Sequence, residues 1–178
     1  APRALYTLSL PGALPLFVAV DPSAGHEDSD WDVVTVFDEV SLEQVAEWRG
    51  KIDLVELADI SMLLAIYYNN AMLAPEVTGV GQGLMAMLQH THYHRLYRRR
   101  NLTQAGVPGS SILGWSTTSS SKNQAVGLTT KALREGYTRW RSRHLLDEAA
   151  AYRAAIVVSD SDGTKMLKMS SQIGRAHV

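Results

Sequence analysis

Two carboxylates stand at or near the ends of short apolar runs. Asp21 follows the run 16–20, and Glu76 lies near the end of the run 71–77. Short runs rich in Val and Ala between turn signals are typical of buried strands. Because neighbouring strand ends lie close together in a sheet, these carboxylates could share a hard cation such as Mg²⁺. Two such ions roughly 4 Å apart can activate a water and stabilise the leaving oxygen of a phosphodiester.

A further acid could reach the same place from the loop after the first run. Asp30 precedes the second apolar run, and Asp28 and Asp32 compete with it for this role. An acid in a turn is more often a solvated residue, and this interpretation is strongest for Glu27 and Asp28. It is weaker for Glu76, the lone acid in a long stretch that otherwise has none.

The glycines of the segment 79–83 (GVGQG) follow an apolar run and precede a helical pattern, which is the context of a dinucleotide-binding fingerprint. Leu84 stands where the third glycine of that fingerprint belongs, and no acid follows about twenty residues later. We therefore interpret the segment as a tight turn that lets a backbone approach closely. The sequence contains no GxxxxGK[ST] motif, which excludes an ATP site of the P-loop type.

Histidines 90, 92 and 94 alternate, so on a strand they would share one face and could bind zinc. Arginines 95 and 98–100 follow, and the more frequent interpretation of such a cluster is a basic surface. The arginine run is either a solvated face or a contact for DNA phosphates.

The segment 115–122 (WSTTSSSK) precedes a helical pattern. Hydroxyls and free N–H groups at a helix start, with the charge of Lys122, can form a phosphate-binding surface. Helix capping alone would explain one Ser or Thr, whereas this segment has six.

Both helices and strands must position these residues. The pattern predicts an antiparallel meander of three strands, a helix opened by Asp53 and ended by Asn69 and Asn70, and a fourth strand. The predicted strands are 16–20, 31–37, 44–48, 71–77, 95–97 and 156–158, the predicted helices are 53–68, 79–89, 122–136 and 143–153, and 101–113 is a loop or ordered flap. This order describes an α/β fold with a mixed sheet flanked by helices.

The composition fits one domain. The chain has 178 residues, 46% hydrophobic and 20% charged, and no cysteine, which excludes disulfides, thiolate metal sites and cysteine nucleophiles. The net charge of −1 conceals an asymmetry. The stretch from Asp21 to Asp59 contains twelve acidic and two basic residues. The stretch from Ile60 to Leu146 contains ten basic and two acidic residues. The basic half could attract a polyanion, although two solvated faces would also explain it.

Both ends are expected to lie outside the fold. Residues 1–15 are interpreted as a linker, because Pro11, Gly12 and Pro15 interrupt the apolar stretch that could suggest a signal peptide. No run approaches the ~20 apolar residues of a membrane span. Residues 173–178 (IGRAHV) back-translate to a widely used sequencing-adapter sequence, so we expect them to be read-through and the domain to occupy 16–172.

Five segments, in this order, resemble the C-terminal nuclease domain of the large terminase subunit of tailed bacteriophages, the DNA-packaging motor. They are VDPSAG at 20–25 with Asp30 and Trp31, AEWRG at 46–50, YNNAMLAPE at 68–76 with Gly81, LYRR at 96–99, and GWSTTS at 114–119 followed by Lys122 and LREG at 133–136. The resemblance covers about Val18 to Gln172 and implies a domain truncated at both ends.

The resemblance implies an RNase H-like fold that cuts double-stranded DNA with two Mg²⁺ or Mn²⁺ ions. By position, Asp21 and Glu76 would be catalytic metal ligands and Asp30 a supporting ligand. The third principal acid would follow Gln172, and Asp160 and Asp162 are poor substitutes for it. The residues expected to hold DNA are Arg98, Arg99, Arg100, Thr117, Thr118, Ser119 and Lys122.

For the intact protein, the resemblance implies an N-terminal ATPase domain, a portal protein and a small terminase subunit as partners. It also implies work in the host cytoplasm during phage assembly, away from any membrane. Two alternatives remain open. The chain could be a catalytically silent RNase H-like module that binds DNA or the portal. It could also be another RNase H-like enzyme, a resolvase or transposase, which the GWSTTS segment disfavours.

Overall fold

A computed structural model describes residues 15–102, 108–158 and 165–171 of the chain. The chain divides into two compact units, Ala1–Arg139 and Trp140–Val178. The expected linker falls almost wholly outside the described residues, as do the expected read-through residues 173–178. The extent of the domain, 16–172, therefore stays a prediction.

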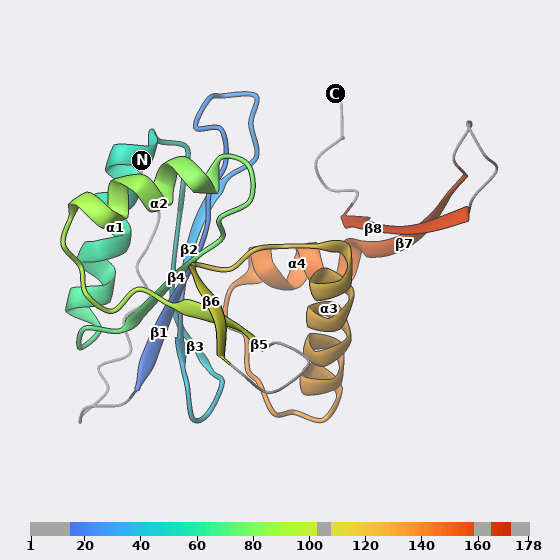
Figure 1. The fold of residues 1–178 in the computed structure, drawn as a ribbon. Helices are drawn as coiled ribbons and strands as arrows, with labels where there is room; N and C mark the ends of the chain where they lie inside the picture. The colour runs from blue at the N-terminus through green and yellow to red at the C-terminus, as the bar shows by residue number, and fades with distance from the viewer. Residues whose placement is uncertain (1–14, 103–107, 159–164, 172–178) are drawn as a thin grey trace. The chain divides into compact units, whose positions relative to one another are not determined.

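The first unit is built on a four-stranded mixed sheet (Figure 1). Its strands are β1 (Leu16–Asp21), β2 (Asp32–Asp38), β3 (Gln44–Gly50) and β4 (Met72–Pro75), in the spatial order β3-β2-β1-β4. The first three form the predicted antiparallel meander, and β4 pairs with β1 in parallel. The mixed α/β architecture expected from the sequence is confirmed.

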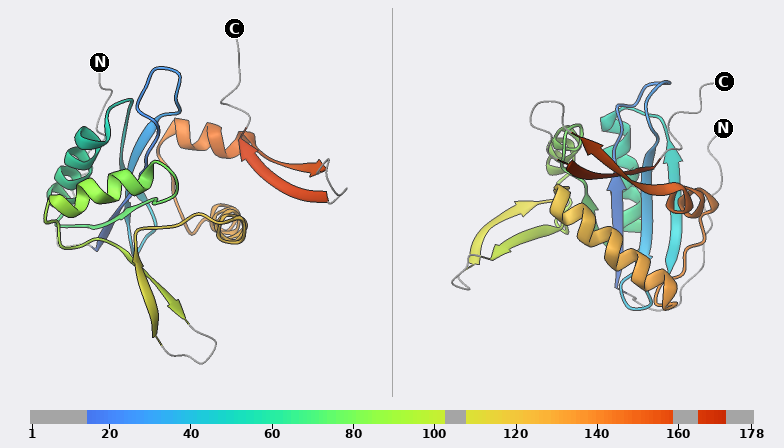
Figure 2. Two further views of the ribbon diagram at one scale, coloured as in Figure 1. Left: turned by 45° about the horizontal axis from the view of Figure 1, so that its top comes forward. Right: turned by 90° about the vertical axis from the view of Figure 1, so that its right-hand side faces the viewer.

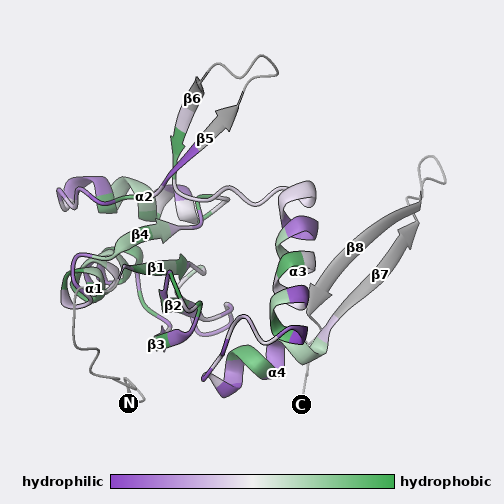
Figure 3. Cartoon of the chain, turned by 90° about the horizontal axis from the view of Figure 1, so that it is seen from below, coloured by the Kyte–Doolittle hydropathy of each residue, from purple (hydrophilic) through white to green (hydrophobic). Residues whose placement is uncertain are grey.

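Helices α1 (Leu54–Tyr67) and α2 (Gly81–His90) lie on the same side of the sheet (Figure 1). As predicted, Asp53 caps α1 by accepting from the amides of Val55 and Glu56. Asn69 and Asn70 then take positive φ angles of 61° and 52°, which end the helix. The core lies between these helices and the sheet, and Figure 3 shows β1 in the green of hydrophobic residues.

A hairpin and a third helix complete the first unit. Strands β5 (Arg98–Leu102) and β6 (Pro108–Leu113) pair antiparallel, and Figure 2 shows this hairpin projecting away from the sheet. Helix α3 spans Ser119–Arg134. The predicted strand 95–97 is wrong, because only Leu96 forms a bridge, with Leu73 of β4. In the segment 101–113, predicted to be a loop or ordered flap, the described residues 101–102 and 108–113 belong to these two strands.

The second unit comprises α4 (Arg143–Ala151) and an antiparallel hairpin of β7 (Tyr152–Val158) and β8 (Lys165–Ser171). The sequence predicted the helix and the first of these strands with different bounds, and it did not predict the second strand. In the part of the chain that the structure describes, no helix is long and apolar enough to span a membrane.

Candidate metal and nucleic-acid site

Asp21 and Glu76 are neighbours across the parallel pair of β1 and β4. The last paired residues of these strands are Val20 and Pro75. The amide of Glu76 donates a hydrogen bond to the carbonyl of Val20 at 2.8 Å, so the register continues for one more residue. Asp21 and Glu76 therefore occupy matched positions at the carboxyl ends of two adjacent strands.

Both carboxylates also belong to the same face of the sheet. Successive side chains of a strand point to opposite faces. Val18 and Val20 are buried in the core, as is Leu73, which pairs with Val18. One residue beyond Val20, Asp21 lies on the face opposite the core, and so does Glu76. Asp21 is exposed and Glu76 is half-buried, which leaves both accessible to a solvated cation.

Asp30 reaches this region from the loop that joins β1 to β2. The loop lines an open hollow of about 400 Å³. Its lining residues are Asp21, Pro22, Ser23, Ala24, His26, Asp28, Ser29, Asp30 and Trp31. The structure thus brings Asp21 and Asp30 to one hollow, while Glu76 joins Asp21 through the strand register. Across the described residues, no three His, Asp or Glu side chains form a group that could hold one metal ion.

Asp32 is excluded as a competitor for Asp30. It is fully buried, and its two carboxylate oxygens accept hydrogen bonds from the amides of Ser23 (2.6 Å) and Ile52 (3.2 Å). Its place in β2 explains this, because Asp32 alternates with the buried Val34 and so lies on the core face. Asp32 ties the loop after β1 to the end of β3. Asp28, in contrast, is exposed and lines the hollow.

Glycines let the backbone close in on both sides of Glu76. A Cβ atom on Gly81 would overlap the carbonyl oxygen of Glu76. Gly114 has a φ of +78°, and a Cβ there would lie 2.8 Å from the carbonyl oxygen of Pro75. The structure confirms the interpretation of 79–83 as a tight turn that permits close approach.

Trp115 links the candidate phosphate-binding segment to this turn. Its amide donates to the carbonyl of Pro75 and its carbonyl accepts from the amide of Val77, both at 2.8 Å, in a bridge opposite Glu76. The amide of Thr117 donates to the hydroxyl of Thr78 at 3.1 Å. The start of α3 is therefore attached beside Glu76.

The predicted DNA-binding residues have different local environments. Thr118 and Ser121 form a capping box at the start of α3, so the Thr118 hydroxyl is a helix cap. Arg99 donates to the carbonyl of Ser116 at 3.2 Å and lies 5.4 Å from the ring centroid of Trp115. Ser119 and Lys122 are exposed in the first turn of α3.

Arg98 is exposed at the start of β5, which Figure 3 colours hydrophilic. The side chain of Arg100 lies outside the described residues.

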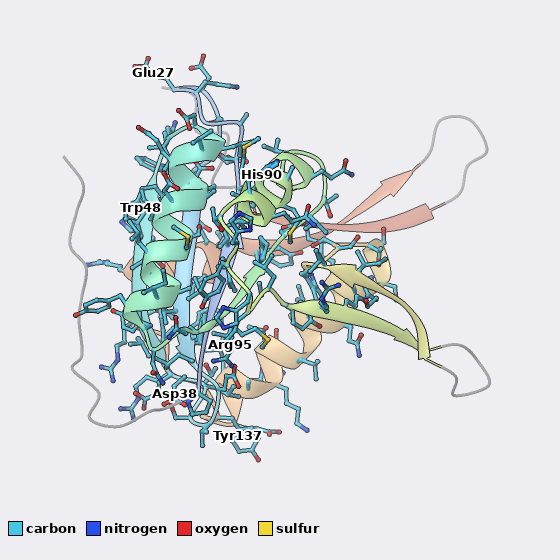
Figure 4. The ribbon with its side chains drawn as sticks, turned by 60° about the vertical axis from the view of Figure 1, so that its left-hand side comes forward. Glu27, Asp38, Trp48, His90, Arg95 and Tyr137 are labelled. Atoms are coloured by element: carbon cyan, nitrogen blue, oxygen red, sulfur yellow. The ribbon has the colours of Figure 1, made fainter. Side chains whose placement is uncertain are left out.

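The three histidines do not share a strand. His90 ends α2, and His92 has a φ of 58° in the turn that follows. All three, including His94, are exposed, while Tyr93 between them is buried. These positions fit the surface interpretation. Figure 4 shows His90 and Arg95 on the segment that leaves α2 and runs beside the sheet.

A cluster of one aromatic and two basic residues that no sequence pattern indicated lies at the rim of the hollow. The ring of Trp31 has the guanidinium of Arg49 at 4.8 Å and the ammonium of Lys51 at 5.2 Å from its centroid. The available signal was that these are the two basic residues of the acidic stretch between Asp21 and Asp59.

Solved structures of phage proteins share this fold. The large terminase nuclease from thermophilic phage G20c aligns with a TM-score of 0.64 and 16% identity, over 89% of this chain and 73% of that one. The same nuclease with bound cobalt gives 0.65 and 16%, over 92% and 74%. The large terminase nuclease domain of Thermus phage P74-26 gives 0.56 and 16%, over 86% and 69%. No protein-family model and no curated protein sequence matches the chain.

The chain therefore has the same mixed α/β fold as these solved nuclease domains. Specifically, it has the fold of the phage large terminase nucleases, and the resemblance seen in the sequence is confirmed at the level of the fold.

Proposed function

We propose that this chain is the nuclease domain of a phage large terminase subunit and that it cleaves double-stranded DNA during genome packaging. One observation carries the proposal. Asp21 and Glu76 lie side by side on the accessible face of the sheet, at the carboxyl ends of two parallel strands. The fold places this pair in a scaffold whose solved relatives are large terminase nucleases, with magnesium in one and cobalt in another.

The donor set fits a hard divalent ion. Two adjacent carboxylates repel each other, and a shared cation relieves that repulsion while leaving coordination positions for water and phosphate oxygens. When bound, Mg²⁺ or Mn²⁺ ions would activate a water and stabilise the leaving oxygen of the phosphodiester. Asp21 and Glu76 would hold two ions with Asp30 in support. The third principal ligand is expected after Gln172.

The remaining residues would position the DNA. Arg98, Arg99 and Lys122 supply positive charge for phosphates, and residues 117–119 supply hydroxyls beside the helix start. Because Thr118 already caps α3 through its hydroxyl, we expect its contribution to be the shape of the helix start. For Arg100 the assignment rests on its place in the arginine run.

The wider role follows the same proposal. In the intact protein, an N-terminal ATPase domain would drive translocation, with the portal protein and the small terminase subunit as partners in the host cytoplasm. A second candidate is a silent module that only binds DNA or the portal. It is favoured by the lack of a group of three acidic or His side chains among the described residues.

Cleavage of supercoiled plasmid distinguishes the two candidates. In a chain that also carries the acid expected after Gln172, we expect nicked and linear products with Mg²⁺ or Mn²⁺, none in EDTA, and none from the Asp21→Asn variant. Asp28→Asn is the matched control, because Asp28 is an exposed carboxylate that lines the same hollow from the loop. Equal cleavage by the wild type and Asp21→Asn would refute the metal role of Asp21. DNA binding without cleavage by a chain that carries the acid expected after Gln172 would favour the silent module.

A further inference from the structure

Trp31 is an exposed aromatic residue beside the hollow. The chain has four tryptophans, all within the described residues. Only Trp31 among them is exposed, with 46% of its surface accessible. Its ring lines the hollow that Asp21 and Asp30 also line. An indole that is partly in contact with water can stack a base on the part of its surface that its neighbours do not cover.

Two cations are held against this ring. Arg49 and Lys51 lie 4.8 and 5.2 Å from the centroid of Trp31, within the range of cation–π attraction. Lys51 also donates to the carbonyl of Glu27 in the loop. We call Trp31, Arg49 and Lys51 the Trp31 cluster.

The loop that carries Trp31 is anchored at several points. Asp32 accepts from the amide of Ser23, and Gly25 packs so closely on the carbonyl of Ile52 that a Cβ atom would overlap it. The hydroxyl of Ser29 donates to the carbonyl of His26 at 2.6 Å. These contacts hold the loop that carries Trp31 in one conformation, which reduces the entropy lost on binding.

We infer that the Trp31 cluster binds an unpaired nucleotide of the DNA, with its base stacked on Trp31 and its phosphate on Arg49 and Lys51. A paired base inside a duplex cannot offer its face to an indole, whereas a single-stranded or gapped base can. The carboxylates of Asp21 and Asp30 repel phosphates from the hollow, so the phosphate would stay on the cations of the cluster. This inference extends the proposed function by adding a preference for DNA with locally separated strands.

The test is equilibrium binding of labelled DNA in EDTA, measured by fluorescence anisotropy, so that cleavage plays no part. The probes are a single strand of about 20 nucleotides, the blunt duplex, and that duplex with a short central gap. Trp31→Ala should weaken binding of the single strand and the gapped duplex by about tenfold, which matches the loss of one stacked base. Binding of the blunt duplex should change by less than about twofold. Trp31→Phe should retain most of the affinity.

Two controls keep this test independent of folding and of the nuclease proposal. Tyr137→Ala removes an exposed aromatic residue that lies at the other end of the sheet from Glu27 (Figure 4), and it should leave all three affinities unchanged. Lys51→Met should weaken the same two probes as Trp31→Ala. An equal loss for all three probes with Trp31→Ala, or no loss for any, would overturn the inference. A chain that never cleaves DNA but shows this selectivity would refute only the proposed nuclease.

Discussion

The amide of Glu76 donates a hydrogen bond to the carbonyl of Val20, the residue before Asp21. The backbone therefore holds Asp21 and Glu76 at matched positions of two adjacent strands. Their spacing is fixed by the parallel pairing of β1 and β4. A site of this kind does not depend on a flexible loop to bring its first two ligands together.

This pairing predicts that metal binding needs both carboxylates. Mn²⁺ should raise the melting temperature of the wild type, because a ligand that binds only the folded state stabilises it. Asp21→Asn and Glu76→Gln should each remove most of that rise, and the double variant should lose little more. The measurement is a thermal melt with and without Mn²⁺. If Mn²⁺ raised the melting temperature of the double variant as much as that of the wild type, the ion would bind elsewhere.

Asp32 is expected to contribute to stability and not to chemistry. Asp32→Ala leaves the buried amide of Ser23 and the part-buried amide of Ile52 without their acceptor, and it should lower the free energy of unfolding by about 1–3 kcal/mol. Asp30→Ala, at an exposed position two residues earlier, should change it by less than about 0.5 kcal/mol. Urea denaturation measures both values. Similar values for the two variants would contradict the anchoring role of Asp32.

The two glycines Gly81 and Gly127 should respond to alanine in opposite directions. A methyl group on Gly81 overlaps the Glu76 carbonyl oxygen, which is backbone and cannot rotate away, so Gly81→Ala should destabilise the fold and impair cleavage. Gly127 lies in α3 with open space around it, so Gly127→Ala should stabilise by about 0.5–1 kcal/mol. Thermal melts of both variants test the pair.

The sequence predicted most of the fold because hydrophobic period, caps and turn residues are local signals. The meander, the Asp53 cap and the stop at Asn69 are such cases. It misplaced the strand at 95–97 because the apolar Leu96 and Tyr97 mark a segment that forms only one bridge to β4. The arginines at 98–100 instead belong to strand β5. This strand forms because it pairs with β6 in a hairpin, which a local sequence pattern does not indicate.

For the candidate site, the sequence could pair Asp21 with Glu76 but could not rank the acids that follow. Asp30 lies in the exposed loop before β2, whereas Asp32 is the first residue of β2 and is buried, and where the strand begins depends on its pairing with β3. Likewise, the contact of Arg49 and Lys51 with Trp31 joins β3 to the loop before β2, which no local pattern indicates.

Stability should fall in alkaline solution because of two buried tyrosines. Burial raises the pKa of Tyr68 and of Tyr93 above 10.0; for Tyr68 the nearby Tyr67 adds to this, and for Tyr93 Arg95 opposes it. The folded state therefore retains these protons more strongly than the unfolded state. This stabilisation is fully present below pH about 10 and is lost as the pH rises through the folded pKa values. Urea unfolding at pH about 8 and about 11 measures the loss.

Phenylalanine substitutions separate the two tyrosines. The Tyr93 hydroxyl donates to the carbonyl of Ala71 at 2.5 Å, so Tyr93→Phe should cost about 1 kcal/mol at neutral pH. Within the described residues the Tyr68 hydroxyl is buried and has no hydrogen-bond partner, so Tyr68→Phe should be neutral or stabilising. Each variant should show less alkaline loss than the wild type. An unchanged alkaline loss in both would assign it to other groups.

The DNA role of the arginine run predicts a change in salt dependence. Arg98→Ala should weaken binding of duplex DNA and reduce the slope of log K against log salt by about 0.9, as expected for one lost phosphate contact. Arg139→Ala is the control, because Arg139 is 70% exposed and pairs with Glu43 at the start of β3. Anisotropy titrations at several salt concentrations give both slopes. Equal slopes for the two variants would mean that only net charge matters.

The order of strands in the sheet also determines when the Asp21 and Glu76 pair is formed during folding. The meander β1-β2-β3 closes through the local connections 22–31 and 39–43, whereas pairing β4 with β1 requires the chain from Pro22 to Ala71 to be folded back first. Long-range parallel pairing pays a larger loop-closure entropy than a hairpin and forms more slowly. We therefore expect the Asp21 and Glu76 pair to be assembled late, so that a partly folded chain has a meander but no site. Pulsed hydrogen exchange should protect the amide of Val34 before that of Glu76.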